Sequence, residues 1–568
     1  MKITDTRDLN YKKNAYIISK LRNPLILIVI TFSIAIFGLT IIPGLDANGN
    51  QTHMGFFDAL FFILYTATTI GYGEGENPLT YLQKVWVFLS IIFTVITWFY
   101  AISKIVSIFQ DKDFMNFLIL TRQQNKIKKI TDNFIIISGY SYAAKKLVNK
   151  ILASKYKMNI IILENNAENN TDITLNYTDK SRIVHLNLEP SLKESLILAG
   201  VKYTNCKAVI ALSDEQRYNL KTTINARFLN EEIKIINHTK TKLEDREFKI
   251  IGEKKNINSY KIIAEELLLL FNNPELSNLI NWIHSGTMTN NVMTMDKKSM
   301  LVIGHGNLGK TLDKKLRSHL DTLTFIDTIE NLEDENVLTG DARYPETITK
   351  QIDFDQYELV FITTKDDYLN YIIAENIHKI DSNKKVFVKV NYEINEALIK
   401  RVSREIKVFN IDKILSYEAF YMLINEDFTK IIKYFKGQEE EYITELYNHI
   451  IANFKKPLYE EIHITQENAY ALYSKINQGE KIPYSIFEAN YELLNKNSSL
   501  LILFIIRDGD TIKLDITLKE EVYIQKEDKV FFIYDNVNGI ESTYKMMQDS
   551  LELNYLLKEI KEEEVYID

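Results

Sequence analysis

Two long apolar runs lie near the start of the chain, with a shorter one between them. Residues 24–42 carry no charge, and residues 81–109 carry only Lys84 and Lys104, one toward each end. As helices at about 1.5 Å per residue, both are long enough for a hydrocarbon core of about 30 Å. The middle run, residues 55–68, is too short to span and fits a re-entrant helix. Two spans with a re-entrant segment between them predict a pore, because non-helical backbone at membrane depth lines a cavity or is buried in protein.

From about residue 131 the chain alternates short apolar runs with amphipathic stretches. The stretches 143–154 and 307–317 have helical spacing. Strands that alternate with helices indicate parallel β-α-β units, and hence doubly wound α/β domains. Buried strands are predicted at residues 133–138, 159–164, 207–212, 233–237, 300–304, 323–327, 358–363 and 385–390.

The β-α-β pattern occurs twice. The two copies share a glycine after the first strand and a polar pair six residues apart further on. We therefore expect two related Rossmann-like domains in tandem. The matched positions are Gly139 with Gly304, and Ser213 and Asn219 with Thr364 and Asn370.

Charge divides the chain into two parts. Residues 24–103 hold five charged side chains in 80 positions, whereas 25% of the whole chain is charged. The apolar block rules out a purely soluble enzyme, and the large polar remainder rules out a polytopic transporter. The length of 568 residues suggests three or four domains at about 150 residues each. The net charge of −8 argues against a nucleic-acid partner, which needs basic surface.

Basic residues flank the apolar block at both ends. Residues 1–22 and 104–130 hold six Lys or Arg each, and residues 43–80 hold none. Basic flanks stay in the cytoplasm. We therefore expect a multi-pass protein of the cell membrane, in contact with lipid, with both termini and the polar body cytoplasmic. The one cysteine, Cys206, excludes internal disulfides and thiolate metal clusters, and its apolar context predicts a core residue in a reducing cytosol.

A glycine-containing octapeptide follows the short apolar run. It is Thr66-Ala67-Thr68-Thr69-Ile70-Gly71-Tyr72-Gly73, and it resembles the potassium-channel signature T-x-x-T-x-G-Y-G at every fixed position. In such a filter, backbone carbonyls replace the hydration shell of K⁺, and glycines permit the required backbone angles. Four copies around one axis would form the pore, which implies a homotetramer. The alternative is a chance Gly-Tyr-Gly turn. The predicted filter is Thr69, Ile70, Gly71, Tyr72 and Gly73, with K⁺ held by the first four.

The second span is expected to line the inner cavity. Thr94 and Thr97 are candidate lining hydroxyls, or else their hydroxyls bond to carbonyls of their own helix. No glycine occurs between Gly75 and Gly139, so this helix has no glycine hinge. No membrane segment is rich in arginine either, so voltage sensing of the usual kind is not expected.

A glycine-rich loop, Gly304-His305-Gly306-Asn307-Leu308-Gly309, follows the first strand of the second α/β domain. Asp327 ends the next strand, 18 residues after Gly309. A strand, a glycine loop, a helix N-terminus and a distal acid together form the setting of a dinucleotide site. The alternative is a tight turn without a ligand. NAD(H) or an adenine nucleotide is predicted to bind at Gly304, Gly306, Asn307, Leu308, Asp327 and Asp341.

The corresponding loop of the first domain is degraded. In Gly139-Tyr140-Ser141-Tyr142-Ala143-Ala144, Ser141 replaces the glycine that would admit the phosphates, although Glu164 still ends the next strand. An empty or altered site is therefore favoured over a second nucleotide site at Gly139, Ser141 and Glu164.

Two acidic pairs follow predicted strands at equivalent places, Asp214-Glu215 and Asp366-Asp367. They could seed a site for a hard cation such as Ca²⁺, or they could cap the helices that follow, and capping is favoured. The nine histidines show no metal-ligand spacing. His305 is expected to lie beside a ligand or to be exposed.

The pore motif and the α/β repeat together resemble one family, the two-span potassium channels with cytoplasmic RCK domains (regulators of potassium conductance). The resemblance covers nearly the whole chain. It implies a gating ring of eight RCK domains from four chains, regulated by nucleotides or divalent cations. Residues 256–283 resemble the helical crossover that pairs RCK domains, and residues 500–535 resemble the small α+β C-terminal lobe of the second domain.

The expected organisation places a helical pore domain before two RCK domains and a tail. Strands are predicted at residues 500–506 and 529–534 of the C-terminal lobe, and a solvated charged helix at residues 542–564. The boundaries are N-terminal segment 1–23, pore domain 24–109, linker 110–130, first RCK domain with crossover 131–298, second RCK N-lobe with crossover 299–436, its C-terminal lobe 437–536 and charged tail 537–568.

The predicted function is a potassium channel gated by an intracellular ligand, and the chain is not expected to be an enzyme. A membrane-anchored NAD-dependent oxidoreductase needs one span only, which leaves the octapeptide unexplained. No convincing catalytic acid–base pair accompanies the glycine loop. An RCK-type regulatory subunit of a separate transporter would leave residues 24–109 unexplained.

Overall fold

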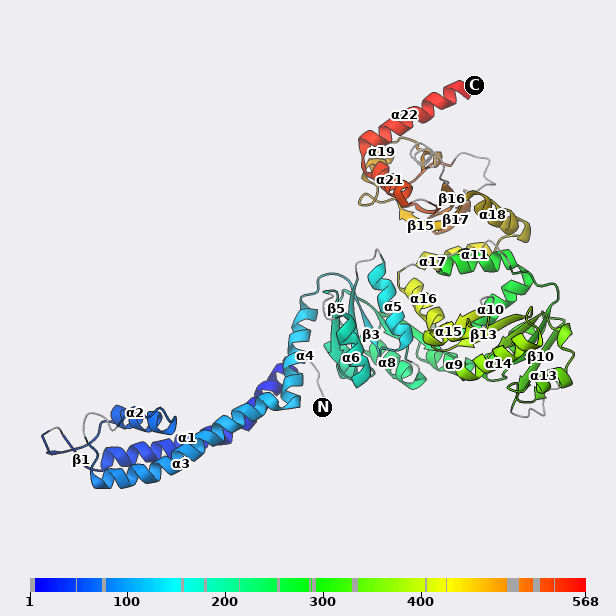
Figure 1. Ribbon diagram of the computed structural model, residues 1–568. Helices are drawn as coiled ribbons and strands as arrows, with labels where there is room; N and C mark the ends of the chain where they lie inside the picture. The colour runs from blue at the N-terminus through cyan, green and yellow to red at the C-terminus, as the bar shows by residue number, and fades with distance from the viewer. Residues whose placement is uncertain are drawn as a thin grey trace. The chain divides into compact units, whose positions relative to one another are not determined.

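The computed structural model follows the chain from a helical membrane part into two α/β sheets and a C-terminal lobe (Figure 1). By its contacts the chain divides into two compact units, Met1–Ser141 with Lys157–Asn237 and Tyr142–Tyr156 with His238–Asp568. The structure describes residues 6–567 except for 47, 74–77, 155–157, 178–180, 214, 253–255, 286–287, 289–292, 329–335, 404–405, 425, 488–499, 514–521 and 536.

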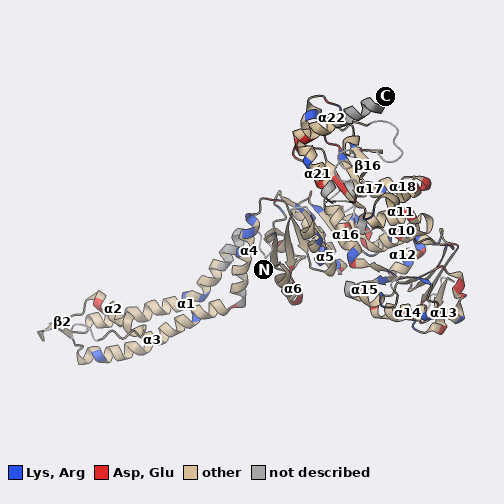
Figure 2. Cartoon of the chain, turned by 45° about the horizontal axis from the view of Figure 1, so that its top comes forward, with Lys and Arg blue, Asp and Glu red and all other residues tan. Residues whose placement is uncertain are grey.

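The membrane part consists of two long helices and one short one. Helices α1 (Thr6–Ile41) and α3 (Tyr81–Gln110) are long and apolar enough to cross a membrane, and α2 (Phe56–Ala67) is not long enough. The two long helices carry few charged residues where they run beside α2 (Figure 2). The layout of two spans and a short helix is therefore as predicted. A two-stranded ribbon, β1 (Gly44–Leu45) with β2 (Gln51–Thr52), lies between α1 and α2.

Helix α1 is longer than the apolar run that predicts it. It begins at Thr6, so that Pro24 lies within the helix. The residues before Pro24 are mostly polar, and they continue the helix beyond the apolar stretch. Within the membrane part, α1 and α3 pack so closely at Gly38 that a Cβ at this position would lie 2.0 Å from Cε2 of Trp86. The Trp86 Nε1–H donates to the carbonyl of Ala35 at 3.0 Å.

Helix α3 begins at a capping box. The Thr80 hydroxyl accepts from the backbone N–H of Gln83, and the Gln83 side chain accepts from the backbone N–H of Thr80. This arrangement satisfies two N–H groups that a helix start leaves without partners. After α3, helix α4 (Lys112–Lys128) leads into the first sheet and packs on its edge strand β5 (Ile183–Asn187).

The first α/β sheet is parallel, with strand order β5-β4-β3-β6-β7-β8. Its central strand β3 is fully buried, and β4 is buried except at Asn159, as is typical of parallel sheets covered on both faces. Cys206 is buried at the start of β6, so it is a core residue as predicted. Burial raises the pKa of its thiol to about 12. The strands not yet bounded are β3 (Phe134–Ser138), β4 (Asn159–Glu164), β6 (Cys206–Ala211), β7 (Lys234–Thr239) and β8 (Ile257–Asn258).

Five helices accompany the strands of the first sheet. Helix α5 groups with the second unit, where it lies against α16 (Ile411–Ile424). The helices are α5 (Tyr142–Ala153), α6 (Ala167–Tyr177), α7 (Lys193–Leu198), α8 (Gln216–Leu229) and α9 (Lys242–Ile250).

The second α/β sheet repeats the topology of the first. Its order is β11-β10-β9-β12-β13-β14, again all parallel, so the predicted tandem repeat of doubly wound domains is confirmed. The strands are β9 (Ser299–Ile303), β10 (Thr322–Asp327), β11 (Val337–Thr339), β12 (Leu359–Ile362), β13 (Lys385–Val390) and β14 (Lys407–Asn410).

Helices of the second unit connect and flank these strands. Helices α10 (Ser259–Asn272) and α11 (Pro274–Ser285) occupy the segment predicted as a helical crossover. The others up to the C-terminal lobe are α12 (Asn307–Leu316), α13 (Pro345–Gln351), α14 (Asp367–Ile380), α15 (Glu393–Ile399) and α17 (Glu426–Lys436), with a 3-10 turn at Phe354–Gln356.

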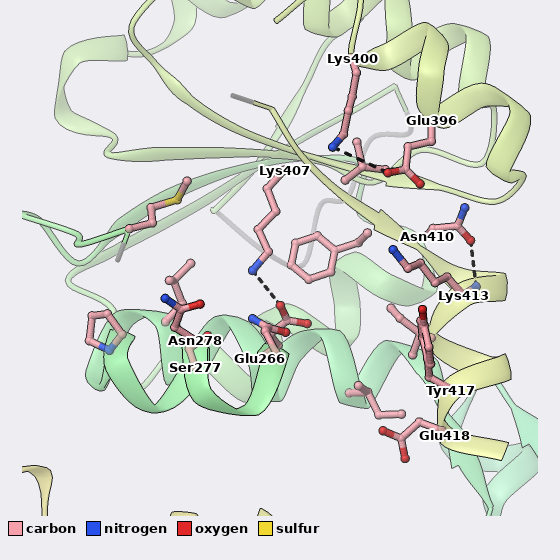
Figure 3. A pocket seen from close by; sticks show the side chains of 18 residues that line it. Glu266, Ser277, Asn278, Glu396, Lys400, Lys407, Asn410, Lys413, Tyr417 and Glu418 are labelled. Atoms are coloured by element: carbon pink, nitrogen blue, oxygen red, sulfur yellow. Dashed lines mark hydrogen bonds and ion pairs between the residues drawn. The ribbon is translucent and has the colours of Figure 1, made fainter. Parts of the chain in front are cut away.

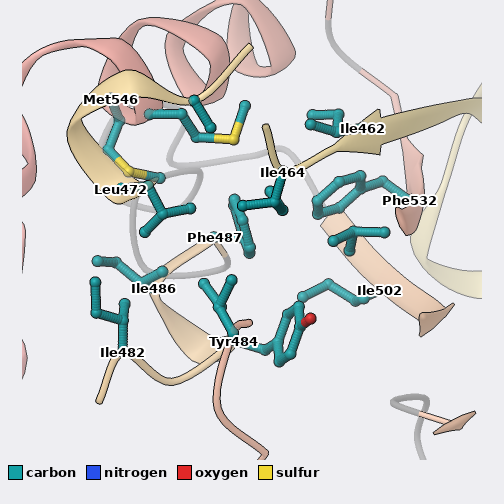
Figure 4. Close-up of a cluster of buried hydrophobic side chains, with 14 of the residues drawn as sticks. Ile462, Ile464, Leu472, Ile482, Tyr484, Ile486, Phe487, Ile502, Phe532 and Met546 are labelled. Atoms are coloured by element: carbon teal, nitrogen blue, oxygen red, sulfur yellow. The ribbon is translucent and has the colours of Figure 1, made fainter. Parts of the chain in front are cut away.

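The C-terminal lobe has an antiparallel sheet of order β15-β18-β16-β17. Its core gathers Ile462, Phe487, Phe532 and other apolar side chains (Figure 4). The elements are α18 (Glu440–Asn453), β15 (Leu458–His463), α19 (Tyr470–Asn477), β16 (Leu500–Arg507), β17 (Asp510–Lys513), β18 (Lys529–Tyr534), α21 (Val537–Gln548) and α22 (Ser550–Ile567).

The end of the chain differs from the solvated helix that the sequence predicts. Residues 542–564 fall in two helices, α21 and α22, and both contribute to the core of the lobe. Met546, Met547 and Leu553 are fully buried there. The frequent charges hide an apolar stripe, because one face of an amphipathic helix is enough to bury it.

Candidate functional site

The octapeptide lies directly after α2, on backbone of unusual geometry. Positive φ angles occur at Thr69 (61°), Gly71 (67°) and Gly73 (131°), and they alternate with Ile70 and Tyr72. An alternating backbone of this kind allows successive carbonyls to face one side. Thr69 is a non-glycine residue in the left-handed region, a conformation that costs about 1–3 kcal/mol and is concentrated at functional sites.

Tyr65, which sequence reasoning missed, holds this segment from α2. Its hydroxyl donates to the carbonyl of Gly73, and its own carbonyl accepts from the N–H of Ile70 at 2.9 Å. The Tyr72 ring lies near the rings of Tyr65 and Phe61, at centroid distances of 6.1 and 5.9 Å. The clue in the sequence was an aromatic residue one position before Thr66, on the last turn of the short helix.

The threonines of α3 face the inside of the chain. Thr94 and Thr97 are 2% and 4% exposed, although a side chain facing a cavity between subunits would be exposed in a single chain. The Thr94 hydroxyl donates to the carbonyl of Ser90 at 2.7 Å. Of the two interpretations, bonding to the helix's own carbonyl is confirmed for Thr94, and cavity lining is wrong for both residues.

A cavity of about 550 Å³ opens at the carboxyl ends of β9, β10 and β12. Of the predicted nucleotide residues, Gly304, Gly306, Asp327 and Asp341 line it. Leu308 is instead buried, and Asn307 is exposed at the first turn of α12 and does not line the cavity. His305, Lys310, Thr364 and Lys365 line it as well.

The three glycines of the loop have different reasons to be glycine. Gly304 has φ +106°, and a Cβ there would lie 2.9 Å from the Thr363 hydroxyl oxygen. A Cβ on Gly309 would lie 2.4 Å from the carbonyl oxygen of Gly304. Around Gly306, the N-cap of α12, a Cβ would meet open space, so this glycine leaves room for a group approaching the helix N-terminus.

Asp327 is tied to the glycine loop. Its Oδ2 accepts from the backbone N–H of His305 at 2.6 Å, which joins the end of β10 to the turn after β9. The second predicted acid, Asp341, accepts from the Arg343 guanidinium, and this contact holds the pKa of Asp341 below its usual value. Both carboxylates line the cavity, and Asp341 is paired there with a guanidinium group.

The His305 ring lies against Phe325, with 4.7 Å between ring centroids, and its side chain is 9% exposed. Its Nε2 lies 3.8 Å from Oδ2 of Asp313. Because the His305 side chain is largely covered and lines the cavity, the exposed alternative is wrong, and a place beside a ligand stays a prediction.

In the first domain, the residues that correspond to the glycine-loop site are occupied by hydrogen bonds within the domain. The Glu164 carboxylate is 5% exposed and accepts from four donors at 2.8–3.0 Å. Tyr140 is also buried and donates to the Tyr177 hydroxyl, while Ser141 donates to the carbonyl of Leu212. These contacts support an altered site rather than nucleotide binding. The donors to Glu164 are the backbone N–H groups of Tyr140, Asn165 and Asn166 and the Asn169 amide.

Of the two acidic pairs, only Asp366 is seen to cap the helix that follows it among the described residues, because Glu215, at the N-cap of α8, makes no side-chain hydrogen bond to that helix. Asp366 accepts from the N–H groups of Tyr368 and Leu369 at the start of α14. Asp367 is buried and accepts from the backbone N–H of Asn391. Asp214 lies outside the described residues. Within the described part of the chain, no group of three or more His, Cys, Asp or Glu is placed to hold a metal ion.

Comparison with known families assigns both parts of the chain. The model described as "Ion channel" matches residues 25–111, and the model of the "TrkA-N domain" matches residues 109–259 and 300–415. The chain is therefore of the class that joins an ion-channel segment to two TrkA-N, or RCK, domains.

Within that class, the curated relatives are potassium channels. "Probable potassium channel protein 2" of Methanocaldococcus jannaschii is 27% identical over 224 residues, covering 39% of this chain and 60% of the relative. "Voltage-gated potassium channel Kch" of Escherichia coli is 24% identical over 44% of this chain and 54% of its own length. The chain thus spans a little over half the length of these two relatives.

Two solved structures align with most of the chain, both at TM-scores below 0.5. The structure described as "GsuK channel bound to NAD" is 13% identical, covers 94% of this chain and 99% of its own, and has a TM-score of 0.46. The "Crystal structure of the GsuK bound to ADP" is 15% identical over 73% of this chain and all of its own, with a TM-score of 0.42.

Proposed function

We propose that the protein is a homotetrameric, potassium-selective channel of the cell membrane, opened or closed by an intracellular nucleotide bound to its second TrkA-N domain. Both termini and the TrkA-N domains are cytoplasmic in this proposal. The observation that carries it is the complete T-x-x-T-x-G-Y-G octapeptide directly after a helix too short to span. The relatives, which are potassium channels, support the same ion.

The geometry around the octapeptide supports a filter. Alternating φ signs let the carbonyls of residues 69–72 face one axis, where they can replace the hydration shell of K⁺. Helix α2 ends at Ala67, so its partial negative charge points toward the entrance of the filter and favours a cation. Tyr65 fixes both ends of the segment through its hydroxyl and its carbonyl.

The cavity at the glycine loop supports a nucleotide as the gating ligand. The open space at Gly306 faces the N-terminus of α12, where a phosphate would be favoured. Lys310 and Lys365 add positive charge to the lining, and Asp327 ends the neighbouring strand, where it can accept from a ribose hydroxyl. NAD(H) and ADP are the candidates of this kind.

A continuous path connects the pore to the first TrkA-N domain. Asp111 ends α3, accepts from the N–H of Phe114 in α4 and accepts from the hydroxyl of Tyr16 in α1. Ile127 of α4 is buried in the core of the first α/β domain. A ligand shifts gating only by its different affinity for the two states, and this path is where a domain movement would reach α3.

Potassium flux tests the proposal directly. Purified full-length protein in liposomes should pass K⁺ in preference to Na⁺, and NAD, NADH or ADP should change the rate. Gly71→Ala should abolish selective flux, because φ at Gly71 is +67° and an L side chain strains that conformation.

Gly49→Ala is the matched control. Gly49 also has a positive φ (+83°) and open space around its Cβ position, but it lies in the turn between β1 and β2. This variant should keep selective flux. Absence of flux under every nucleotide condition would refute the channel, and selective flux through Gly71→Ala would refute the assignment of the filter. Nucleotide turnover without flux would favour the membrane-anchored oxidoreductase instead.

A further inference from the structure

A second cavity, of about 570 Å³, lies in the second unit and shares no lining residue with the cavity at the glycine loop. Helices α10 and α11 form one wall, and β14 with the start of α16 forms the other (Figure 3). Its volume is within the range of about 300–1,000 Å³ that is usual for small-molecule sites.

Two buried polar atoms of this cavity have no hydrogen-bond partner among the described residues. They are Oγ of Ser277 and Nδ2 of Asn410, on residues that are 2% and 3% exposed. The orientation of the Asn410 amide is set by its Oδ1, which accepts from the N–H of Lys413 at 3.0 Å and caps α16. The Nδ2 group is thereby left as a donor, and an unsatisfied buried donor costs about 1–3 kcal/mol.

The charges of the lining favour an anion at the same end. Lys407 pairs with Glu266 at 2.7 Å, and Lys400 pairs with Glu396 at 3.9 Å (Figure 3). Lys413 has no carboxylate within 4.0 Å in the part of the chain that the structure describes. It lies in the first turn of α16, whose N-terminus also favours negative charge.

Burial also reduces the opposing negative charge. Burial, with the nearby Glu265, raises the pKa of Glu418 to about 7, and Lys436 opposes that shift. At neutral pH this lining carboxyl is therefore protonated in a large fraction of molecules. The rest of the lining includes two amides, those of Asn278 and Asn281, and an apolar wall that carries two aromatic rings. This wall is formed by Ile262, Leu270, Val408, Phe409, Ile414 and Tyr417.

We propose that this cavity binds a small organic carboxylate with an apolar body, its carboxylate beside Asn410 and Lys413 and its body against Phe409 and Tyr417. The Nδ2–H of Asn410 donates to the carboxylate, and Lys413 supplies the counter-charge. The proposal goes beyond the nucleotide site and does not depend on ion conduction.

One wall of the cavity also contacts α5, so binding in the cavity can affect the packing of α5 against α16. Nζ of Lys150 in α5 lies over the ring of Tyr417, 3.4 Å from the ring centroid. The rings of Phe420 and Tyr421 lie further from the same Nζ. Burial, and then the charge of Lys413, lower the pKa of Lys150 to about 8. A carboxylate beside Lys413 reduces this repulsion, so its binding should strengthen the contact between α16 and α5.

Calorimetry on the full-length protein in detergent tests the site with defined probes. We expect 4-phenylbutyrate and octanoate to bind, and 4-phenylbutyramide and 4-phenylbutylamine to bind much more weakly. Asn410→Asp keeps the oxygen that caps α16 but replaces the donor by a negative charge, and should weaken carboxylate binding by about tenfold or more. Lys413→Gln should weaken it similarly.

Lys379→Gln is the matched control, because Lys379 is an exposed lysine of α14 whose side chain is 71% exposed and outside the cavity. It should leave carboxylate affinity unchanged, and saturating ADP should not displace the probe. Failure of both carboxylates to bind at millimolar concentration, preference for the amine, or unchanged affinity in Asn410→Asp would overturn the proposal. None of these outcomes depends on flux, so failure of the channel proposal is distinguishable.

Discussion

At the scale of single residues, two carboxylates at equivalent strand ends distinguish the two α/β domains. Glu164 is buried and accepts from four donors of its own domain, which approaches the capacity of a carboxylate. Asp327 accepts from the N–H of His305 and lines a cavity. One strand-end acid thus has a structural role in the first domain, and its counterpart borders the candidate ligand site of the second.

Asp327→Ala should weaken NAD or ADP binding by about 1.5–3 kcal/mol, the value of one hydrogen bond to a charged group. Titration calorimetry of the full-length protein measures the change. Glu164→Ala is the control: it should leave the nucleotide dissociation constant unchanged and lower the thermal stability, because it leaves buried donors unpaired. An unchanged dissociation constant in Asp327→Ala would remove this residue from the site.

At the scale of elements, the last helix shows how charge composition conceals packing. Helix α22 contains Lys and Glu in quantity, yet Leu553 is fully buried and Leu556 nearly so. Leu551, two positions before Leu553, is 82% exposed. The helix is therefore a component of the C-terminal lobe, which it covers with one apolar face.

Leu553→Ala should destabilise the C-terminal lobe by about 2–5 kcal/mol, since it removes a fully buried side chain and leaves a cavity. Leu551→Ala makes the same chemical change on the exposed face and should alter stability by no more than about 0.5 kcal/mol. Scanning calorimetry of the full chain compares the two. Equal effects of the two substitutions would contradict the burial of this helix.

The elements that could be predicted from the sequence are those with strong apolar patterns. Both spans, the short helix and the buried strands could be predicted, because the length and spacing of their apolar runs indicate the type of element. The bond from Tyr65 to Gly73 could not be predicted, because an aromatic residue at the end of the short helix does not by itself indicate a hydrogen bond to a residue eight positions further on. The second cavity could not be predicted either, because it depends on contacts between distant parts of the chain. Glu266 and Lys407, which pair in its lining, are 141 positions apart in the sequence.

At the scale of the whole molecule, the single chain leaves its pore surfaces uncovered. Ile70 and Tyr72 are 71% and 77% exposed, and Phe93 and Ile96 of α3 are more than 60% exposed. In the proposed tetramer, other copies of the chain cover this exposed apolar surface of the proposed filter segment. The filter proposal therefore includes the assembly, because one chain supplies only one side of an ion path.

Mass measurement in detergent should give four chains of 66.3 kDa each. Native mass spectrometry, or light scattering with correction for detergent, distinguishes this from smaller species. Gly71→Ala should assemble with the same number of chains, because the change strains the filter backbone without removing an apolar contact. A monomer or dimer under conditions that preserve potassium flux would refute the fourfold arrangement.

The buried thiol has a practical consequence for following this molecule in motion. Cys206 is the one cysteine of the chain, and its raised pKa keeps it in the unreactive thiol form. A cysteine introduced on an exposed position would then be the one thiol per chain that a maleimide dye or spin label modifies. Fluorescence or pulsed-resonance distances between labelled copies can therefore be recorded without first removing native cysteines.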